Sequence, residues 1–253
     1  MLFDSHAHFD DERFDDDRHQ LLCSMAENGV SNIVNIGADL QSSRNSVLLA
    51  EAYDFIYAAV GVHPHDAKDM TEDTISELKK LSAHQKVVAI GEIGLDYYYD
   101  NSPRETQGYW FDRQMKLAYE LNLPVIIHSR DATEDTIAIC KANKIHGGII
   151  HCYSGSVESA KIYLDMGYHI SFAGPVTFKN ARALPEVAKI VPEDRLLIET
   201  DSPYMAPEPH RGKRNSSIYV RHVAEKIAEL RGVSTEHIAK ITSDNAKALF
   251  NIK

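Results

Sequence analysis

Histidines and carboxylates recur where apolar runs end along this 253-residue chain. The first run, LFDSH (2–6), leads into His6 and His8. Side chains alternate between the two faces of an extended strand, so both imidazoles point the same way and can reach a single metal ion. A strand end in solvent can carry two histidines as well, so the rest of the chain has to decide between these interpretations.

Five further runs end in residues of the same kinds. They end in GVHPH, GEIGLD, IIHSR, IIHCYSG and IETDSP, which contain His63, His65, Glu92, His128, His151 and Asp201. Taken singly, Glu92 could cap a turn, and Asp201 before Ser-Pro could form one. Six such ends together predict a metal site. Imidazole nitrogens with carboxylate oxygens and no cysteine suit Zn²⁺ or Mn²⁺, or Mg²⁺ where oxygens dominate.

The elements that would position these residues alternate regularly. Eight runs rich in Val, Ile, Leu and Ala predict parallel strands covered on both faces, at 2–6, 32–37, 55–62, 86–93, 124–129, 147–153, 168–174 and 195–200. Amphipathic stretches between them predict helices, such as 105–122, and helices at about 217–231 and 234–250 end the chain. Eight strands separated by helices in ~250 residues predict an α/β fold, a (β/α)8 TIM barrel with extra C-terminal helices. We expect one domain, 1–253.

A doubly wound open sheet is the alternative fold. Its glycine fingerprint is absent after the first predicted strand, where His-Ala-His stands instead. Barrel enzymes place their chemistry at the C-terminal ends of the strands, which is where six of the eight ends here carry imidazoles or carboxylates. Asp131 with Glu134 also predicts a capping box that opens the helix after the fifth strand.

The composition limits the partners. With 27 basic and 37 acidic residues, the chain has a formal charge of −10, which argues against broad non-specific adhesion to nucleic acid. A phosphate-bearing substrate remains compatible, because bound divalent cations can supply positive charge locally. No apolar run approaches the roughly 20 residues that span a bilayer. The N-terminus lacks a signal-peptide pattern, so we expect a cytoplasmic protein without a membrane partner.

Three cysteines, Cys23, Cys140 and Cys152, show no CxxC spacing. We expect them to be reduced thiols that are buried or semi-buried. Cys152 directly follows His151, so strand alternation predicts that its sulfur points away from the metal site.

The ordered set HxH, GVHPH, GEIGLDYY, IIHSR, HCYSG and ETDSPY followed by RGKRN resembles the TatD family of metal-dependent deoxyribonucleases, among the amidohydrolase-like barrels. The resemblance covers essentially the whole chain. It implies two divalent ions (Mg²⁺, Mn²⁺ or Zn²⁺), one held by His6, His8, Glu92 and Asp201, with Glu92 bridging to a second held by His128 and His151. Many amidohydrolase relatives bridge their metals with a carboxylated lysine. Glu92 at that position favours phosphodiester over amide chemistry, by analogy.

The activity that the resemblance implies is a 3′–5′ exonuclease acting on single-stranded DNA through a metal-activated water. Asp201 is our candidate for orienting or deprotonating that water. Beside the bridging Glu92, His63 would contact the scissile phosphate or protonate the leaving oxygen. His65 is a weaker candidate for substrate binding. No obligate protein partner is evident.

Other residues are candidates for holding the DNA. PHRGKRN (209–215) contains Arg211, Lys213 and Arg214, which form either a phosphate-positioning loop or an ordinary solvated basic loop. Tyr97 in DYYYD either stacks on a base or packs at the barrel rim. Arg130 either reaches a phosphate or pairs with a nearby carboxylate.

Two other functions use the same residues. A metal-dependent esterase or amidase, such as an aminoacyl-tRNA deacylase, needs the same ligands to polarise a carbonyl, so turnover of aminoacyl-tRNA against DNA would separate the two. A non-catalytic barrel could hold metal for structure or to dock a partner, although structural sites are usually closed by protein ligands. Failure to exchange metal or to hydrolyse an activated phosphodiester would favour that third function.

Overall fold

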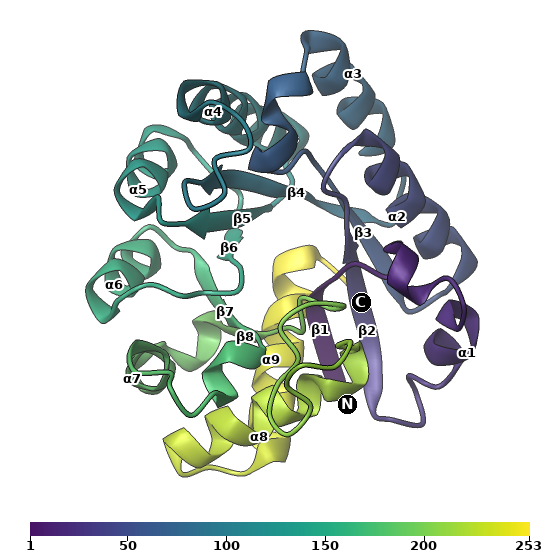
Figure 1. Ribbon diagram of the computed structural model, residues 1–253, viewed down its shortest axis with the longest axis vertical. Coiled ribbons are helices and arrows are strands. Elements are labelled where there is room, and N and C mark those ends of the chain that lie inside the picture. The colour runs from purple at the N-terminus through teal and green to yellow at the C-terminus, as the bar shows by residue number, and fades with distance from the viewer.

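The computed structural model describes residues 1–253 and contains eight parallel strands inside a ring of helices (Figure 1). The strands are β1 (Leu2–Ala7), β2 (Val30–Ile36), β3 (Ile56–Val60), β4 (Val87–Asp96), β5 (Val125–Arg130), β6 (Gly148–Ile150), β7 (His169–Phe172) and β8 (Leu196–Ile198). The helices are α1 (Arg18–Cys23), α2 (Leu40–Ala52), α3 (Glu72–Leu81), α4 (Arg104–Leu121), α5 (Thr133–Ala142), α6 (Val157–Asp165), α7 (Ala183–Ile190), α8 (Val220–Arg231) and α9 (Thr235–Phe250). None of these helices combines the length and the apolarity needed to cross a bilayer.

The predicted α/β barrel is confirmed. The strands pair side by side in chain order, β1 to β8, and every pair is parallel. All eight predicted strands are present, and the largest difference at an end is three residues, as in β4, which ends at Asp96 rather than at 93. Because α8 follows β8 as the eighth helix of the ring, α9 is the only additional C-terminal helix.

The ring of strands closes through few contacts. Between β8 and β1 the only ladder pairing is an isolated bridge, Ala7 to Ser202. The N–H of His8 donates to Ser202 O (2.7 Å), and the N–H of Asp201 donates to His6 O (2.9 Å). The seam that closes the barrel therefore contains three of the predicted metal ligands, His6, His8 and Asp201.

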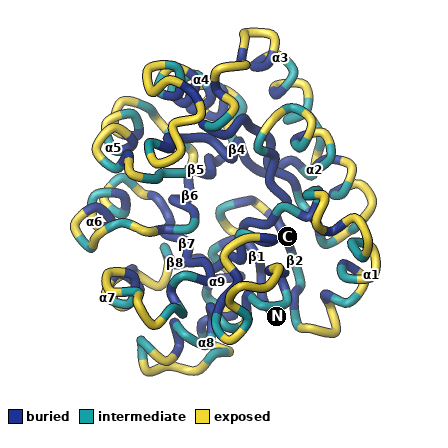
Figure 2. Tube along the Cα trace, in the orientation of Figure 1, coloured by how far each residue is buried: buried dark blue, intermediate teal, exposed yellow.

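Two apolar clusters hold the barrel. The larger cluster, 52 buried residues, lies between the strands and the helices. A second cluster of 12 fills the barrel interior and includes Phe250 and Ile252 from the end of the chain. The ring of Phe250 stacks on Phe3 near the start of β1, with centroids 6.1 Å apart. The strands are buried and the outer faces of the helices are exposed (Figure 2), and α9 covers the end of the barrel opposite the predicted site.

Two local predictions are wrong. Helix α5 has Ala132 at its N-cap and no side-chain cap, so the capping box of Asp131 and Glu134 does not form. Asp131 instead adopts a left-handed conformation (φ 54°) that turns the chain one residue earlier. Cys23 is exposed rather than buried, because the short helix α1 buries only Leu22. The other two thiols lie as predicted, one buried and one half-buried.

Gly94 lets β4 and β5 approach each other at the site. Its φ is +144°, and a Cβ there would lie 1.9 Å from His128 O. We expect Gly94→Ala to lower the free energy of unfolding by at least about 2 kcal/mol, through backbone strain and this clash. Gly108→Ala is the matched control. It lies inside α4 with its nearest neighbour 3.8 Å away, so it should raise stability by about 0.5–1 kcal/mol. Urea denaturation measures both, and equal effects would contradict the prediction.

Candidate metal centre

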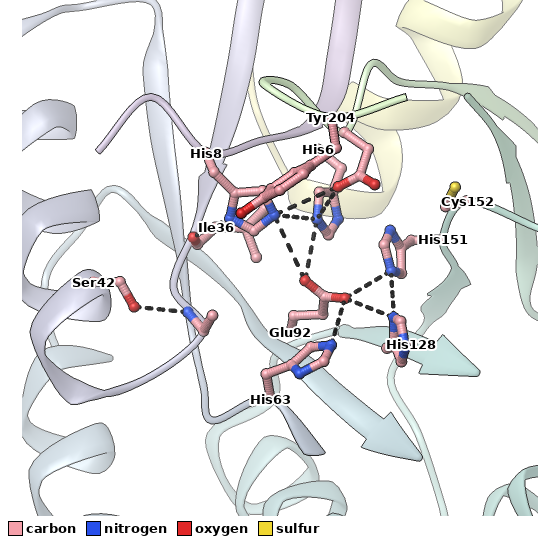
Figure 3. A network of polar contacts seen from close by, with 12 residues as sticks. His6, His8, Ile36, Ser42, His63, Glu92, His128, His151, Cys152 and Tyr204 are labelled. Atoms are coloured by element: carbon pink, nitrogen blue, oxygen red, sulfur yellow. Dashed lines mark hydrogen bonds and ion pairs between the residues drawn. The ribbon is translucent and has the colours of Figure 1, made fainter. Parts of the chain in front are cut away.

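Seven predicted residues converge at the C-terminal ends of the strands (Figure 3). They are buried or half-buried and come from β1, β4, β5 and the segments that follow β1, β3, β6 and β8: His6, His8, His63, Glu92, His128, His151 and Asp201. The carboxylate of Glu92 lies at the centre of the cluster.

One oxygen of Glu92 faces a group of three histidines. Its Oε1 lies 2.8 Å from His151 Nε2 and 2.9 Å from His128 Nδ1. His63 Nε2 is 3.4 Å from the same oxygen. The two nearer nitrogens, His128 Nδ1 and His151 Nε2, are themselves 3.3 Å apart. This half of the site therefore gathers nitrogens from three elements around a single oxygen.

The other oxygen of Glu92 faces the closing seam. Its Oε2 lies 3.4 Å from His6 Nε2 and 3.7 Å from His8 Nε2. Asp201 Oδ1 is 3.7 Å and 3.6 Å from the same two nitrogens, and these nitrogens are 3.1 Å apart. Glu92 thus offers one oxygen to each half of the cluster, which fits the bridging position that the sequence predicts for it.

Hydrogen bonds on the outer side of the cluster orient three of the imidazoles. Each bonds to an acceptor through the nitrogen turned away from Glu92: His8 Nδ1 to Ile36 O (3.0 Å), His151 Nδ1 to Glu199 Oε1 (3.2 Å) and His128 Nε2 to Asp96 Oδ2 (3.0 Å). Carbonyl and carboxylate oxygens can only accept, so each outer nitrogen carries the proton. In its neutral form, each ring therefore presents a lone pair to the cluster.

Those lone pairs make the centre a cation site. The nitrogens of His128 and His151 face Glu92 Oε1 at 2.9 and 2.8 Å, and two acceptors at that distance repel unless a cation lies between them. The possible ligand atoms form compact groups, within 4.8 Å of one another, in His6–His8–Glu92 and in His63–Glu92–His128. Imidazole and carboxylate donors without thiolate fit a divalent ion such as Zn²⁺ or Mn²⁺.

When no metal is bound, protons on the histidines supply the positive charge that the facing acceptor atoms require. Burial alone would lower the pKa of His8, but Asp201 and Glu92 outweigh burial and raise it to about 9. Burial opposes protonation of His151 as well, yet Glu92 and Glu199 raise its pKa. The same pairing holds the pKa of Glu92 well below its ordinary value despite burial. The carboxylate stays ionised, and a metal ion must displace protons from the histidines to bind.

His63 differs from the other histidines in the position of its proton. Its Nδ1 accepts a hydrogen bond from the backbone N–H of His65 (3.1 Å). Burial lowers the pKa of His63 to about 4, so the ring is neutral and carries its proton on Nε2, facing Glu92. In this tautomer His63 presents a hydrogen-bond donor to the centre, which suits the predicted contact with a phosphate or leaving oxygen.

Asp96 is a functional residue that the sequence interpretation misses. Its Oδ2 accepts from His128 Nε2 (3.0 Å) and from His65 Nε2 (3.1 Å). His65 therefore contacts the cluster in two ways, through Asp96 and through its ring, which lies 4.3 Å from that of His63. Ending the fourth strand at 93 hides this residue, although alternation along a longer strand places Glu92 and Asp96 on one face.

Glu199 is the second missed residue, and it lies completely buried behind His151. Its Oε1 accepts from His151 and from the backbone N–H of Cys152 (2.8 Å). Its Oε2 has no partner, and neither does the buried Nδ1 of His6. In the sequence, the spacing of two residues between Glu199 and Asp201 was the signal that could have identified Glu199. Cys152 lies in the turn after β6, and its sulfur points away from the cluster as predicted (Figure 3).

The two candidates beside β4 and β5 behave differently. The guanidinium of Arg130 lies 4.0 Å above the ring of Tyr98 and 4.8 Å from that of Tyr99, and it forms no ion pair. Tyr97 instead donates its hydroxyl to Asp135 (2.7 Å). Of the two interpretations of Tyr97, the structure favours packing at the rim. Its two exposed neighbours, Tyr98 and Tyr99, are the rings that face solvent.

The predicted basic loop is mostly engaged in contacts within the protein. Arg214 forms two hydrogen bonds with Asp17 (2.6 and 2.8 Å). The guanidinium of Arg211 lies 4.2 Å over the ring of Phe178. Lys213 forms no ion pair and is exposed. Of the three basic residues in this loop, Lys213 has the most freedom to reach a phosphate.

Comparison with known proteins identifies relatives over the full length. A family model described as "TatD related DNase" matches residues 3–251. The chain is 52% identical over 254 residues to "Uncharacterized metal-dependent hydrolase YabD" of Bacillus subtilis (strain 168), covering 100% of both chains. It is 34% identical over 259 residues to "3'-5' ssDNA/RNA exonuclease TatD" of Pantoea ananatis, covering 99% of this chain and 100% of that one.

A solved structure agrees with the fold. The crystal structure of YJJV, a TatD homolog from Escherichia coli K12, superimposes with a TM-score of 0.94 at 32% identity, covering 100% of this chain and 98% of that one. At this level of similarity, the barrel and its connections are shared over the whole chain.

Glu199 should strengthen metal binding, because it holds the proton of His151 on the outer nitrogen. We expect Glu199→Gln, which keeps the shape and removes the charge, to weaken Zn²⁺ binding roughly 10–100-fold. Competition against a chromophoric chelator measures the affinity, and thermal unfolding checks the fold. Glu236→Gln, an exposed change on α9, is the control. An unchanged affinity in Glu199→Gln would show that Glu199 does not support metal binding through His151.

Proposed function

This chain belongs to the TatD-related DNase family of metal-dependent hydrolases, and we propose that it removes nucleotides from the 3′ end of single-stranded DNA. The resemblance predicted from the sequence is thereby confirmed. Two full-length relatives from Pantoea, each 34% identical, are named as 3′–5′ ssDNA/RNA exonucleases, which supports the direction and the kind of substrate. The relative at 52% identity is named only as an uncharacterized metal-dependent hydrolase.

The position of Glu92 carries the proposal. Each of its oxygens faces a separate group of histidines, which supports two divalent ions, the first with His6, His8, Glu92 and Asp201 and the second with Glu92, His128 and His151. When bound, such ions stabilise charge on phosphoryl oxygens and lower the pKa of water. The contacts around this centre favour the ionised carboxylates that ligands require, whereas His8 and His151 must lose protons before their nitrogens can bind a metal.

Two side chains are placed to handle protons. Asp201 is half-buried, and contacts with His8 and His6 keep its pKa low although burial opposes this. As an ionised carboxylate it can orient a water and accept its proton. His63 presents Nε2–H to the centre and can donate to a non-bridging or leaving oxygen of the phosphate. The acceptor and the donor thus stand on opposite sides of Glu92.

The substrate contacts that we propose are local to the mouth of the barrel. Arg130 carries a guanidinium with no carboxylate partner, held in place by two tyrosine rings. Tyr98 and Tyr99 are 58% and 54% exposed, which leaves ring surface for stacking on bases. A chain of net charge −10 needs such localised cations to hold a phosphate backbone.

Glu92→Ala should abolish hydrolysis. The test uses chelator-stripped protein and end-labelled single-stranded DNA with Mg²⁺, Mn²⁺ or Zn²⁺ restored. We expect a metal-dependent ladder shortening from the 3′ end, and a rate at least about 1,000-fold lower in the variant, since the ions contribute several kcal/mol. Circular dichroism checks the fold. Full activity in the variant would refute the bridge. No ladder with any metal would refute the nuclease and direct the assay to aminoacyl-tRNA.

Arg130→Gln should raise KM for DNA about tenfold with a smaller effect on kcat, because it removes one positioning contact to phosphate and leaves the cluster intact. Arg195→Gln is the matched control, because Arg195 pairs with Asp194 at the start of β8, away from the site. Steady-state kinetics on single-stranded DNA measure both variants. Equal KM values in Arg130→Gln and wild type would exclude the contact.

A further inference from the structure

The rim of the barrel that carries the metal centre is acidic over most of its length. The segment 8–17, which follows β1, contains six acidic residues and one arginine. The short segments that follow β2, β4 and β5 (37–39, 97–103 and 131–132) each contain one aspartate and no basic residue. A polyanion that leaves the centre over these segments is therefore repelled.

The segments that follow β7 and β8 have the opposite charge. Residues 173–182 and 203–216 contain five basic side chains and a single carboxylate, Glu208. Of the five, Arg214 is paired with Asp17. The other four are exposed, and their side chains form no ion pair and no hydrogen bond: Lys179, Arg182, Arg211 and Lys213. We call these four residues the β7–β8 basic patch.

Direct contacts hold the two segments side by side. The backbone N–H of Glu208 donates to Thr177 Oγ1 (2.9 Å). The guanidinium of Arg211 lies 4.2 Å over the ring of Phe178, which immediately precedes Lys179 in the chain. The basic residues of the two segments are thus brought together on the same part of the rim.

The chain itself connects the patch to the metal centre. The segment after β8 begins beside Asp201 and passes Tyr204, whose ring lies 6.1 Å from that of His8 (Figure 3). Nine residues after Tyr204 it reaches Lys213. A strand that has one phosphate at the centre can therefore follow this segment outwards over the patch.

The direction of digestion determines which part of the substrate needs such a surface. When one nucleotide is removed from a 3′ end, every other phosphate of the strand lies on the 5′ side of the scissile bond. Lysine and arginine hold a phosphate backbone without reading its sequence. Because the four cations of the patch have no carboxylate partner, no internal ion pair has to break when a phosphate binds.

We propose that the β7–β8 basic patch binds the phosphates of the single strand on the 5′ side of the scissile bond. The patch holds the strand on the rim while its 3′ end is at the metal centre, and the acidic segments elsewhere on the rim disfavour other paths. This inference rests on the proposed exonuclease function, and it adds the path by which the strand leaves the centre.

The salt dependence of binding counts these contacts without catalysis. Fluorescence anisotropy on the Zn²⁺-loaded protein measures the affinity for a labelled phosphorothioate strand of ten thymidines, which keeps the charge of each linkage and resists hydrolysis. Each phosphate contact contributes about 0.7 to the slope of log K against log salt for a single strand. We expect Lys179→Gln/Lys213→Gln to make this slope less negative by about 1.4 and to weaken binding at least about tenfold at low salt.

Lys141→Gln/Lys144→Gln is the matched control. Both lysines are exposed and form no ion pair, and they lie at the end of α5 and before β6, at the opposite end of the barrel. The two double variants have the same net charge, yet the control should keep the wild-type slope. Equal slopes in the wild type and Lys179→Gln/Lys213→Gln would overturn the proposal. The same reduction in both double variants would also overturn it, by assigning the effect to overall charge.

Strand length separates the patch from the metal centre. We expect the wild type to bind ten thymidines at least about tenfold more tightly than two at low salt, because the shorter strand has no phosphate beyond the centre. Equal affinities would overturn the proposal. If the protein digests no strand but Lys179→Gln/Lys213→Gln lowers the slope, the exonuclease fails and the patch stands as a surface for single strands. If DNA is digested and the slope is unchanged, the exonuclease stands and the patch fails.

Discussion

The ionised carboxylate of Glu92, buried among histidines, is the interaction on which the rest of the site depends. Its two oxygens face different groups of imidazoles, and those imidazoles keep it charged although it is almost fully buried. A single buried charge of this kind would be very costly without compensation. His8, His128 and His151, whose pKa values Glu92 helps to raise, therefore have two tasks: each compensates the charge of Glu92 in the protein and can offer a nitrogen to a metal ion.

Closure of the barrel and assembly of this centre are the same structural event. The seam between β8 and β1 has a single bridge, and His6, His8 and Asp201 themselves take part in two backbone hydrogen bonds across it. A metal ion held by these side chains would link the two sides of the seam, and its binding energy would then add to the stability of the closed barrel. At the opposite end α9 packs against the barrel interior. Apolar contacts thus stabilise the end of the barrel opposite the site, and polar contacts stabilise the end that contains the site.

The sequence predicted the barrel and the inner residues because both follow from local patterns. Strands buried on both faces are continuously apolar, and ligands stand where such runs end. The sequence interpretation did not identify Asp96 and Glu199, because they act through other side chains and no local sequence pattern indicates that role. The partner of Tyr97 depends on how β4 and α5 pack, and the exposure of Cys23 depends on how α1 lies on the barrel. Both need the assembled fold.

The outer hydrogen bonds decide which histidine does what. All the histidines of the cluster have the same ring, yet in their neutral forms His8 and His151 direct a lone pair at the centre while His63 directs a proton. The difference lies in the partner of the outer nitrogen: a carbonyl or carboxylate for the first two, and a backbone N–H for His63. Exchanging an acceptor for a donor behind a ring would convert a ligand into a proton donor without moving it. The hydrogen-bond partners behind the rings therefore determine which histidines can bind metal and which can contact substrate.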